Sequence, residues 1–420
     1  GTPAGLPSGE RYHDQARFFF GLYQILIDHY QPSVVFVLNG IPCVSSALSA
    51  VARRLSIPTF WLENGLLPAT LVLDPDGVNY GASISGDRWH QRDRCPANAS
   101  QLEGLRRYRE RLCRSAETLL TRGEIMDRTQ IRQTLGIPAD HRVVVVPLQL
   151  EKDSNIICYS PVFKSMHAFA RFGVDTFASR EKWSVIIKDH PKRAPGGDAE
   201  MEAMAGANVY YVRDIRVTSL LDAADAVMCL NSTVGLEALM RGLPVIALGQ
   251  STYSEKGLTY DAYRENPMMG RLDTFLDQPF DNDAFESFLY ELLATHLLPV
   301  AGDEDAFGAR ARMVKNILAS MDRDGREGPP RLAVPACVIK CIKSAEKEFQ
   351  SLRRLSGSRR PMIIVKGDIM GRRRRRLRAA LERALPGVVL HEASGLKCLA
   401  SRMRHSHAAS VHFPRRDPKL

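Results

Sequence analysis

The chain has 420 residues, a hydrophobic content of 45% and a formal net charge of +10. This length exceeds what one hydrophobic core usually serves, so we expect more than one domain. No apolar run approaches the roughly 20 residues of a membrane-spanning helix, and the eight cysteines form no CxxC pair, which argues against a disulfide scaffold or a zinc module. Because the opening residues show no secretory leader, we expect a cytoplasmic protein.

In the first part of the chain, strands and helices alternate. This rhythm is typical of βαβ units, in which helices cover a parallel sheet. The predicted elements are a helix at 16–30, a strand at 34–40, a helix at 44–56, a strand at 59–65, a long helix at 102–120 and a linker at 135–141.

A second series follows with a cleaner doubly wound pattern. Its predicted strands are RVVVVPLQL (142–150), WSVIIKDHP (183–191), NVYYVRD (208–214), AVMCL (226–230) and PVIALG (244–249). Its predicted helices are 166–177, 217–224, 232–242, 283–298 and 305–321. We therefore expect an α/β fold with two Rossmann-type domains, at 1–138 and 139–328, that face a cleft, followed by a basic C-terminal appendage at 329–420.

The positive charge is concentrated in this appendage. Residues 331–420 contain 22 Lys and Arg against 6 Asp and Glu, a net charge of +16, which leaves −6 for residues 1–330. Residues 358–393 predict a strand, an Arg-rich helix and a strand. Three interpretations stay open: peripheral binding to the anionic inner-membrane surface, nucleic-acid binding, or a solvated and partly disordered tail. We expect no nucleic acid, because no aromatic residues alternate with the arginines.

Polar clusters follow four of the predicted strands. The carboxyl ends of strands in doubly wound domains meet at one edge, where ligands bind, so these groups are candidates for one site. They are Glu63-Asn64-Gly65, Gln149 to Ser154, Lys188 to Pro191, and Asn231-Ser232-Thr233.

Each cluster also has a purely structural interpretation. Glu63 could be a solvated turn carboxylate, Asp153 a turn or N-cap residue, and His190 the mark of an extended turn before proline. Asn231 and Ser232 could simply cap the next helix.

Taken together, the clusters favour sugar transfer from a nucleotide. Lys188, His190 and the backbone amides of 232–235, including that of Gly235, would bind a phosphate at a helix N-terminus. Two carboxylates, Glu63 and Asp153, would flank a reacting sugar carbon, which is the usual equipment for glycosyl transfer. No cofactor and no metal are expected, since DPDG at 74–77 lacks the other ligand positions of a calcium loop.

Four segments, in this order, resemble the bacterial capsule polysaccharide biosynthesis family, which includes retaining β-Kdo glycosyltransferases. They are WLENGLLPATLVLDPDGVNYGASI, VPLQLEKDSNI, IIKDHP and NSTVGLEALMRGLPVIALGQSTYSEKGLT. The resemblance covers roughly residues 30–325, and Asn64 stands where the family motif has a second carboxylate.

The resemblance implies a GT-B-like enzyme that transfers Kdo from CMP-Kdo, with CMP on the C-terminal domain. It implies that Asp153 is the nucleophile and Glu63 the acid/base. It also implies that His190, Ser232 and Thr233 hold the CMP phosphate. Gln149 and Ser154 belong to the nucleophile segment, and Glu237 would reach the ribose or the cytidine.

The implied acceptor is a cell-surface polysaccharide or its lipid terminus. One alternative is a transferase for another CMP-linked ulosonic acid or another nucleotide sugar. A further alternative is a non-catalytic protein that binds polyanions or nucleic acid through its basic tail.

Overall fold

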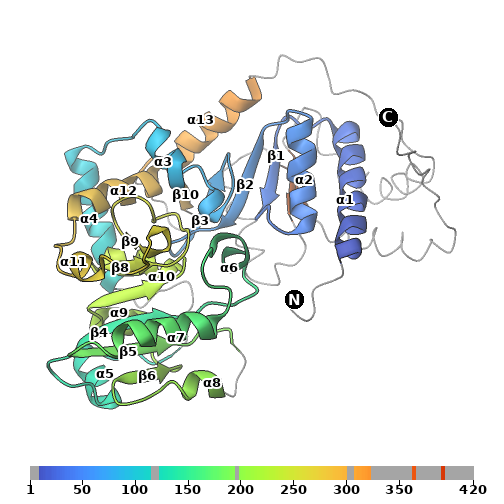
Figure 1. Ribbon diagram of the computed structural model, residues 1–420. Coiled ribbons are helices and arrows are strands. Elements are labelled where there is room, and N and C mark those ends of the chain that lie inside the picture. Colours follow the sequence, from blue (N-terminus) through green and yellow to red (C-terminus); the bar gives the residue numbers. More distant parts are fainter. Residues whose placement is uncertain are drawn as a thin grey trace. The chain divides into compact units, whose positions relative to one another are not determined.

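The computed structural model describes residues 9–114, 123–193, 198–299, 307–322, 362–365 and 389–392 (Figure 1). The chain divides into two compact units. Unit 1 comprises residues 1–62 and 314–420, and unit 2 comprises residues 63–313. The α/β fold class expected from the sequence is confirmed, because strands of both units pair in parallel and helices connect them.

Unit 1 contains four parallel strands in the order β2-β1-β11-β12. Its strands are β1 (Val35–Leu38), β2 (Thr59–Asn64, whose last two residues are counted with unit 2), β11 (Met362–Val365) and β12 (Val389–Glu392). Helix α2 (Cys43–Arg54) connects β1 to β2 and packs against α1 (Gly9–Tyr30).

Both strands expected at the ends of the basic segment 358–393 are confirmed. We expected them in a separate appendage, whereas β11 pairs in parallel with β1 and therefore extends the N-terminal sheet. The Arg-rich helix predicted between them lies outside the described residues.

Unit 2 contains a sheet of six parallel strands in the order β6-β5-β4-β7-β8-β9. The strands are β4 (Arg142–Pro147), β5 (Trp183–Lys188), β6 (Val209–Val212), β7 (Ala226–Cys229), β8 (Val245–Ala247) and β9 (Tyr260–Asp261). In β4 the run Val143–Val146 is fully buried, as expected for a parallel strand that is covered on both faces.

Helices cover both faces of this sheet. Val144, Val146 and their neighbours on one face form a core with residues of α6 (Ser154–Tyr159), α7 (Met166–Phe177), α8 (Ala199–Glu202) and α11 (Leu272–Leu276). Helices α9 (Val217–Ala223) and α10 (Thr233–Met240) pack against the strands outside this core, and α5 (Arg128–Leu135) packs on α9. The sheet is therefore doubly wound, as the sequence predicted.

The rest of unit 2 includes a short antiparallel pair of strands. Strand β3 (Thr70–Asp74) pairs with β10 (Leu297–Pro299), so the predicted helix 283–298 ends earlier, as α12 (Asn282–Thr295). The remaining elements are the 3-10 turns η1 (Asn79–Gly81) and η2 (Ala262–Arg264), α3 (Gly86–Gln91), α4 (Ala99–Arg114) and α13 (Ala309–Asp322), which crosses the boundary between the units.

Arginines of α4 attach this helix to the second half of the chain. Arg106 forms two parallel hydrogen bonds to Glu286 of α12, at 3.0 and 2.9 Å, and Arg109 donates to the carbonyl of Met240 at the end of α10. The domain boundary that we predicted near residue 138 consequently lies inside unit 2, and the one near 328 lies outside the described residues. The three-domain division stays a prediction.

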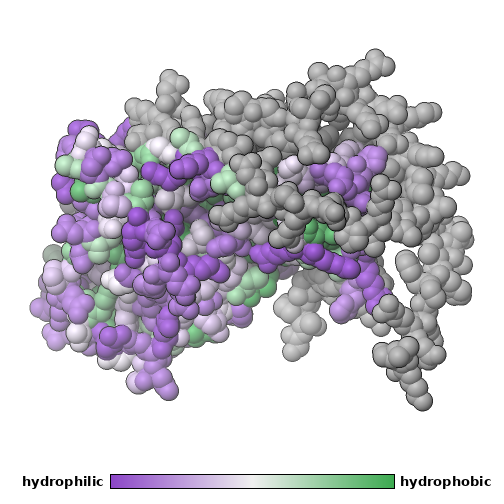
Figure 2. Space-filling view, turned by 90° about the horizontal axis from the view of Figure 1, so that it is seen from above, coloured by the Kyte–Doolittle hydropathy of each residue, from purple (hydrophilic) through white to green (hydrophobic). Residues whose placement is uncertain are grey.

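Within the described ranges, every helix is too short or too polar to span a bilayer. Figure 2 shows hydrophilic and hydrophobic residues mixed over one face of the described part, without a broad apolar belt.

Candidate active site

A cavity of about 200 Å³ lies at the carboxyl ends of β4, β5 and β7, entirely within unit 2. We call it the strand-end cavity. It is lined by Pro147, Leu148, Gln149, Leu150, Asp153, Asn155, Lys188, Asp189, His190, Pro191, Val217, Asn231, Ser232, Thr233, Val234 and Glu237. Eight of the eleven residues that the sequence singled out are among them; Glu63, Ser154 and Gly235 are not. Three of the four polar clusters thus meet at the predicted edge of the sheet.

The junction between β7 and α10 forms one wall of the cavity. Ser232 is the N-cap of α10, and its hydroxyl accepts from the backbone N–H of Val234 at 3.2 Å. The N–H of Gly235 donates to the Ser232 carbonyl at 3.0 Å. The capping role is therefore real, and it coexists with the positive end of a helix dipole at the cavity.

Gly235 is required here by a close approach. The hydroxyl of Tyr253 donates to the Ser232 carbonyl at 2.6 Å, and a Cβ on residue 235 would lie 2.3 Å from that hydroxyl oxygen. No side chain fits at such a separation. The absence of a side chain at Gly235 thus lets the Tyr253 hydroxyl reach the Ser232 carbonyl at the cavity wall. Tyr253 is a supporting residue that the sequence analysis missed.

Gln149 and Asn231 bind each other across the floor of the cavity. Gln149 Nε2 donates to Asn231 Oδ1 at 3.1 Å, and Gln149 Oε1 accepts from the Asn231 backbone N–H at 3.3 Å. Asn231 Nδ2 also donates to the carbonyls of Asn155 and Tyr159. These bonds tie the end of β7 to the end of β4 and to α6, so both side chains fix the shape of the site.

Asp153 is the N-cap of α6, as its structural interpretation predicted. Its Oδ1 accepts from the backbone N–H of Asn155 at 2.8 Å. The carboxylate is nevertheless exposed and lines the cavity. Ser154 follows as the first, half-buried residue of the helix.

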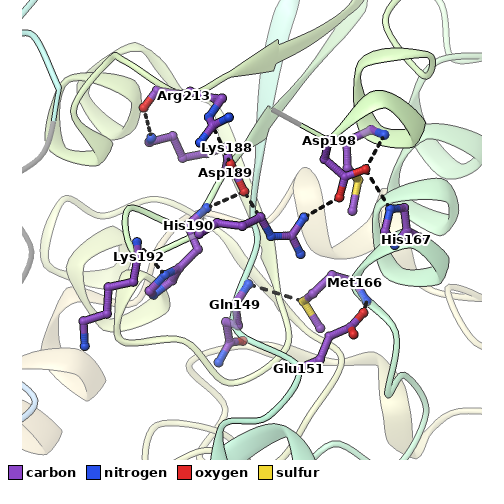
Figure 3. A network of polar contacts seen from close by, with 12 residues as sticks. Gln149, Glu151, Met166, His167, Lys188, Asp189, His190, Lys192, Asp198 and Arg213 are labelled. Carbon is purple, nitrogen blue, oxygen red and sulfur yellow. Dashed lines mark hydrogen bonds and ion pairs between the residues drawn. The ribbon is translucent and has the colours of Figure 1, made fainter. Parts of the chain in front are cut away.

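The end of β5 and the residues that follow it bring two buried charges and an imidazole to the cavity. Lys188 Nζ donates to the carbonyl of Arg213 at 2.7 Å, and buried Asp189 accepts from the backbone N–H of His190 at 2.9 Å. Burial, the largest influence, and nearby Lys192 lower the pKa of His190. Figure 3 shows how these side chains are arranged. Asp189 was not among the predicted site residues, although it lies between two that were.

Glu237 lies one turn into α10 and is half-buried. Burial raises its pKa to about 7, against the opposing influence of Arg241. A carboxyl that titrates near neutral pH in a cavity is typical of functional sites.

Glu63 lies at the carboxyl end of β2. Its Oε1 accepts from the backbone N–H and the side-chain amide of Asn64, at 2.8 and 3.0 Å. Among the described residues, no cluster of His, Cys, Asp and Glu could hold a metal ion.

Comparisons with known proteins match the part of the chain that contains this cavity. Residues 99–294, which include the whole strand-end cavity, match the family described as capsule polysaccharide biosynthesis protein. Protein FixF of Sinorhizobium fredii (strain NBRC 101917 / NGR234) is 29% identical over 245 residues, or 58% of this chain and 54% of that protein. The capsule polysaccharide export protein KpsS of Escherichia coli is 30% identical over 138 residues, or 30% of this chain and 34% of that protein. The chain thus spans about half or less of the length of these relatives.

Among solved structures, the chain is similar to "Thermosulfurimonas dismutans KpsC, beta Kdo 2,7 transferase". The TM-score is 0.43 at 20% sequence identity, and the match covers 68% of this chain and 80% of that one.

Proposed function

We propose that this member of the capsule polysaccharide biosynthesis family is a retaining glycosyltransferase that moves β-Kdo from CMP-Kdo to a cell-surface polysaccharide or its lipid terminus. The observation that supports it best is the strand-end cavity. This cavity brings an exposed carboxylate, a histidine and a helix N-terminus together from three strand ends.

In the first step, the free oxygen of Asp153 attacks the anomeric carbon of Kdo. The bond from that carbon to the phosphate oxygen breaks, and CMP leaves with the electron pair. The N-terminus of α10, with Ser232 and Thr233, would bind the developing phosphate charge. A positioned donor of this kind contributes about 3 kcal/mol to the transition state.

In the second step, an acceptor hydroxyl attacks the same carbon and displaces the Asp153 carboxylate. Glu63 would take the proton of that hydroxyl, which makes it the acid/base of a double displacement. Two inversions at one carbon give net retention.

The cap at Asp153 allows a clean test. Asparagine caps a helix about as well as aspartate, whereas alanine costs about 1 kcal/mol. We expect Asp153→Asn to leave the unfolding midpoint unchanged and to lower CMP release from CMP-Kdo by about 10³-fold or more. Asp153→Ala would lose both activity and some stability. Wild-type activity in Asp153→Asn would contradict the nucleophile.

The choice of donor is tested separately by nucleotide binding. If the cavity binds a cytidylate, CMP raises the melting temperature of the protein and UDP does not. Protection by UDP alone would instead favour a transferase for another nucleotide sugar.

We also propose that the net charge of +16 on residues 331–420 holds the enzyme against the anionic face of the inner membrane from the cytoplasmic side. Each Lys or Arg near such a surface contributes about 1 kcal/mol. Sedimentation with phosphatidylglycerol vesicles, but not with phosphatidylcholine vesicles, is the expected result. Equal sedimentation with both would contradict it.

A further inference from the structure

A second and larger cavity lies within unit 2, away from the strand-end cavity. Its volume is about 620 Å³, which is within the usual range of ligand-binding cavities. We call it the arginine cavity, because Arg106, Arg109, Arg128 and Arg241 line it. The two cavities share no lining residue and lie at opposite ends of α10, whose N-terminus reaches the strand-end cavity while Met240 lines the arginine cavity.

One face of α4 forms a wall of the arginine cavity. Arg106, Arg109, Glu110 and Cys113 line it, and residues at this spacing lie on the same side of a helix. The facing wall comes from the ends of α9 and α10, which pack against each other, and α10 also contacts α4. Helices that are distant in the sequence therefore enclose the space together.

The floor of the arginine cavity is apolar. It is formed by Leu221, Ala224 and Met240, which are buried, and by half-buried Leu243. Among the described residues that line the cavity, none is aromatic. A charged rim above an aliphatic floor suits a ligand with an anionic head and an apolar part.

Three of the four arginines already form ion pairs. The pairs are Arg106 with Glu286, Arg128 with Asp225, and Arg241 with Asp222. Of these three carboxylates, only that of Asp222 lines the cavity. The guanidinium groups therefore outnumber the acidic side chains that face a ligand.

Arg109 differs from the other three arginines. Its Nε donates to the carbonyl of Met240 at 2.6 Å and its Nη1 to Asn282 Oδ1 at 3.1 Å, and both acceptors are neutral. Within the described part of the chain, Arg109 has no carboxylate at ion-pair distance, and no hydrogen bond uses its Nη2. Burial, against the opposing influence of Cys113 and Glu286, lowers the pKa of Arg109. A guanidinium nevertheless stays protonated, so a half-buried positive charge is left with free N–H donors.

The carboxyl end of α10 does not cancel this charge. A helix C-terminus disfavours anions through its unpaired carbonyls. Here the Met240 carbonyl accepts from Arg109 and from the Cys113 thiol, and the Glu237 carbonyl accepts from Arg241 Nη1 at 3.2 Å. The arginines thus satisfy the helix end and still present outer N–H groups.

We propose that the arginine cavity binds an anionic phospholipid, with the phosphate on Arg109 and the rim arginines and the glycerol with the first acyl carbons on the apolar floor. Guanidinium groups bind phosphate oxygens through paired, charge-assisted hydrogen bonds. A bilayer surface supplies such lipids to basic pockets. The site is separate from the proposed sugar transfer, since neither the nucleotide nor Asp153 takes part in it.

The thiol of Cys113 reports directly on occupancy of the arginine cavity. The whole chain is treated with iodoacetamide, and alkylation of each cysteine is followed by peptide mass spectrometry. Dihexanoyl-phosphatidylglycerol, kept below its micelle concentration, should slow alkylation of Cys113 about tenfold at ten times its Kd. Alkylation of Cys158, which is exposed on α6, should not change. An unchanged rate at Cys113 would overturn the proposal.

Three probes separate the phosphate from the apolar part of the ligand. We expect glycerol 3-phosphate to bind at least about 10-fold more weakly than dihexanoyl-phosphatidylglycerol, because it lacks the acyl carbons. Dihexanoyl-phosphatidylcholine should also bind at least about 10-fold more weakly, because its choline adds a positive charge beside the arginines. Equal binding of glycerol 3-phosphate would make the ligand a soluble phosphate ester, and equal binding of the choline lipid would exclude recognition of charge. Either result overturns the proposal.

A matched pair of variants tests the arginine itself. We expect Arg109→Gln to bind the glycerol lipid about 10- to 100-fold more weakly, as for a lost hydrogen bond to a charged group. Arg107→Gln is the control, since Arg107 is exposed on the same helix and pairs with Glu103 outside the cavity. Equal affinity in the two variants would contradict the proposal.

A second variant covers the case in which Arg109→Gln does not fold, since Arg109 attaches α4 to α10. Arg128 is exposed at the rim, and Arg128→Gln should weaken lipid binding about 3- to 10-fold through the lost charge. Wild-type affinity in this variant would then overturn the proposal. Because Cys113 does not line the strand-end cavity, its protection by lipid is independent of CMP binding. Failure of the proposed function is therefore distinguishable from failure of the lipid site.

Discussion

The carboxyl of Glu237 should make the stability of this protein depend on pH near neutrality. Its pKa is about 7 in the folded protein, against an ordinary value of 4.5, because the half-buried side chain on α10 is partly removed from water. Burial therefore penalises its charged form, and the folded chain holds a proton that the unfolded chain releases. Stability must then fall as pH rises from about 4.5 to 7.

The size of the effect follows from the two pKa values. Each factor of ten in proton affinity corresponds to 1.36 kcal/mol. Between pH 5 and pH 8 the ionised carboxyl should cost about 2.5 kcal/mol of folding free energy. Glu237→Gln removes this titration. The free energy of unfolding of the variant, relative to that of wild type, should therefore increase by that amount between pH 5 and pH 8.

The assay is urea unfolding of the whole chain at pH 5, 6, 7 and 8, with the midpoint compared between wild type and variant. Glu181→Gln is the matched control, since it makes the same chemical change at an exposed position of the same unit. A constant difference between Glu237→Gln and wild type would refute the reasoning.

Three further predictions test contacts within unit 2. Gly235→Ala should cost about 1–3 kcal/mol of stability by overpacking. In a double-mutant cycle, adding Tyr253→Phe should recover part of this loss. Free-energy changes of the two substitutions that simply add would contradict the contact. Asn231→Ala should cost about 1–3 kcal/mol, since it leaves its buried partners unpaired, and an unchanged urea midpoint would contradict this. For Asp74, burial acts to raise the pKa, but hydrogen bonds, first from His296, outweigh it and lower the pKa. Wild type should therefore lose stability as pH falls below 4, and Asp74→Asn should show a flatter profile in acid unfolding; parallel profiles would contradict it.

The sequence predicted the convergence of the site because strand ends follow a topological rule. The apolar runs that end at Gln149, Lys188 and Asn231 are unambiguous strands. Parallel pairing then brings their carboxyl ends to one edge without any further information. The second sheet and the helix after Asn231 were predictable for the same reason.

The contacts that shape the site were not predictable in this way. Tyr253 reaches Gly235 from a loop after β8, and nothing in either local pattern marks the pair. The bond between Gln149 and Asn231 likewise joins residues 82 positions apart.

The attachment of the helix at 99–114 was not predictable for a related reason. The periodicity of the helix at 99–114 shows one apolar face, but it does not show which sheet that face covers. The two arginines that attach α4 to α12 and to α10 look like ordinary surface charges in the sequence. The strands at 362–365 and 389–392 were predicted as strands, yet β1, the partner of the first of them, lies more than 300 residues earlier.

The central claim is a covalent bond between Kdo and Asp153, and intact-mass spectrometry of the protein after incubation with CMP-Kdo alone tests it. The claim predicts a mass increase of one Kdo residue in wild type, located by peptide mapping on the segment that contains Asp153, and none in Asp153→Asn. CMP release without any adduct in the wild type, or an adduct that persists in Asp153→Asn, would contradict it.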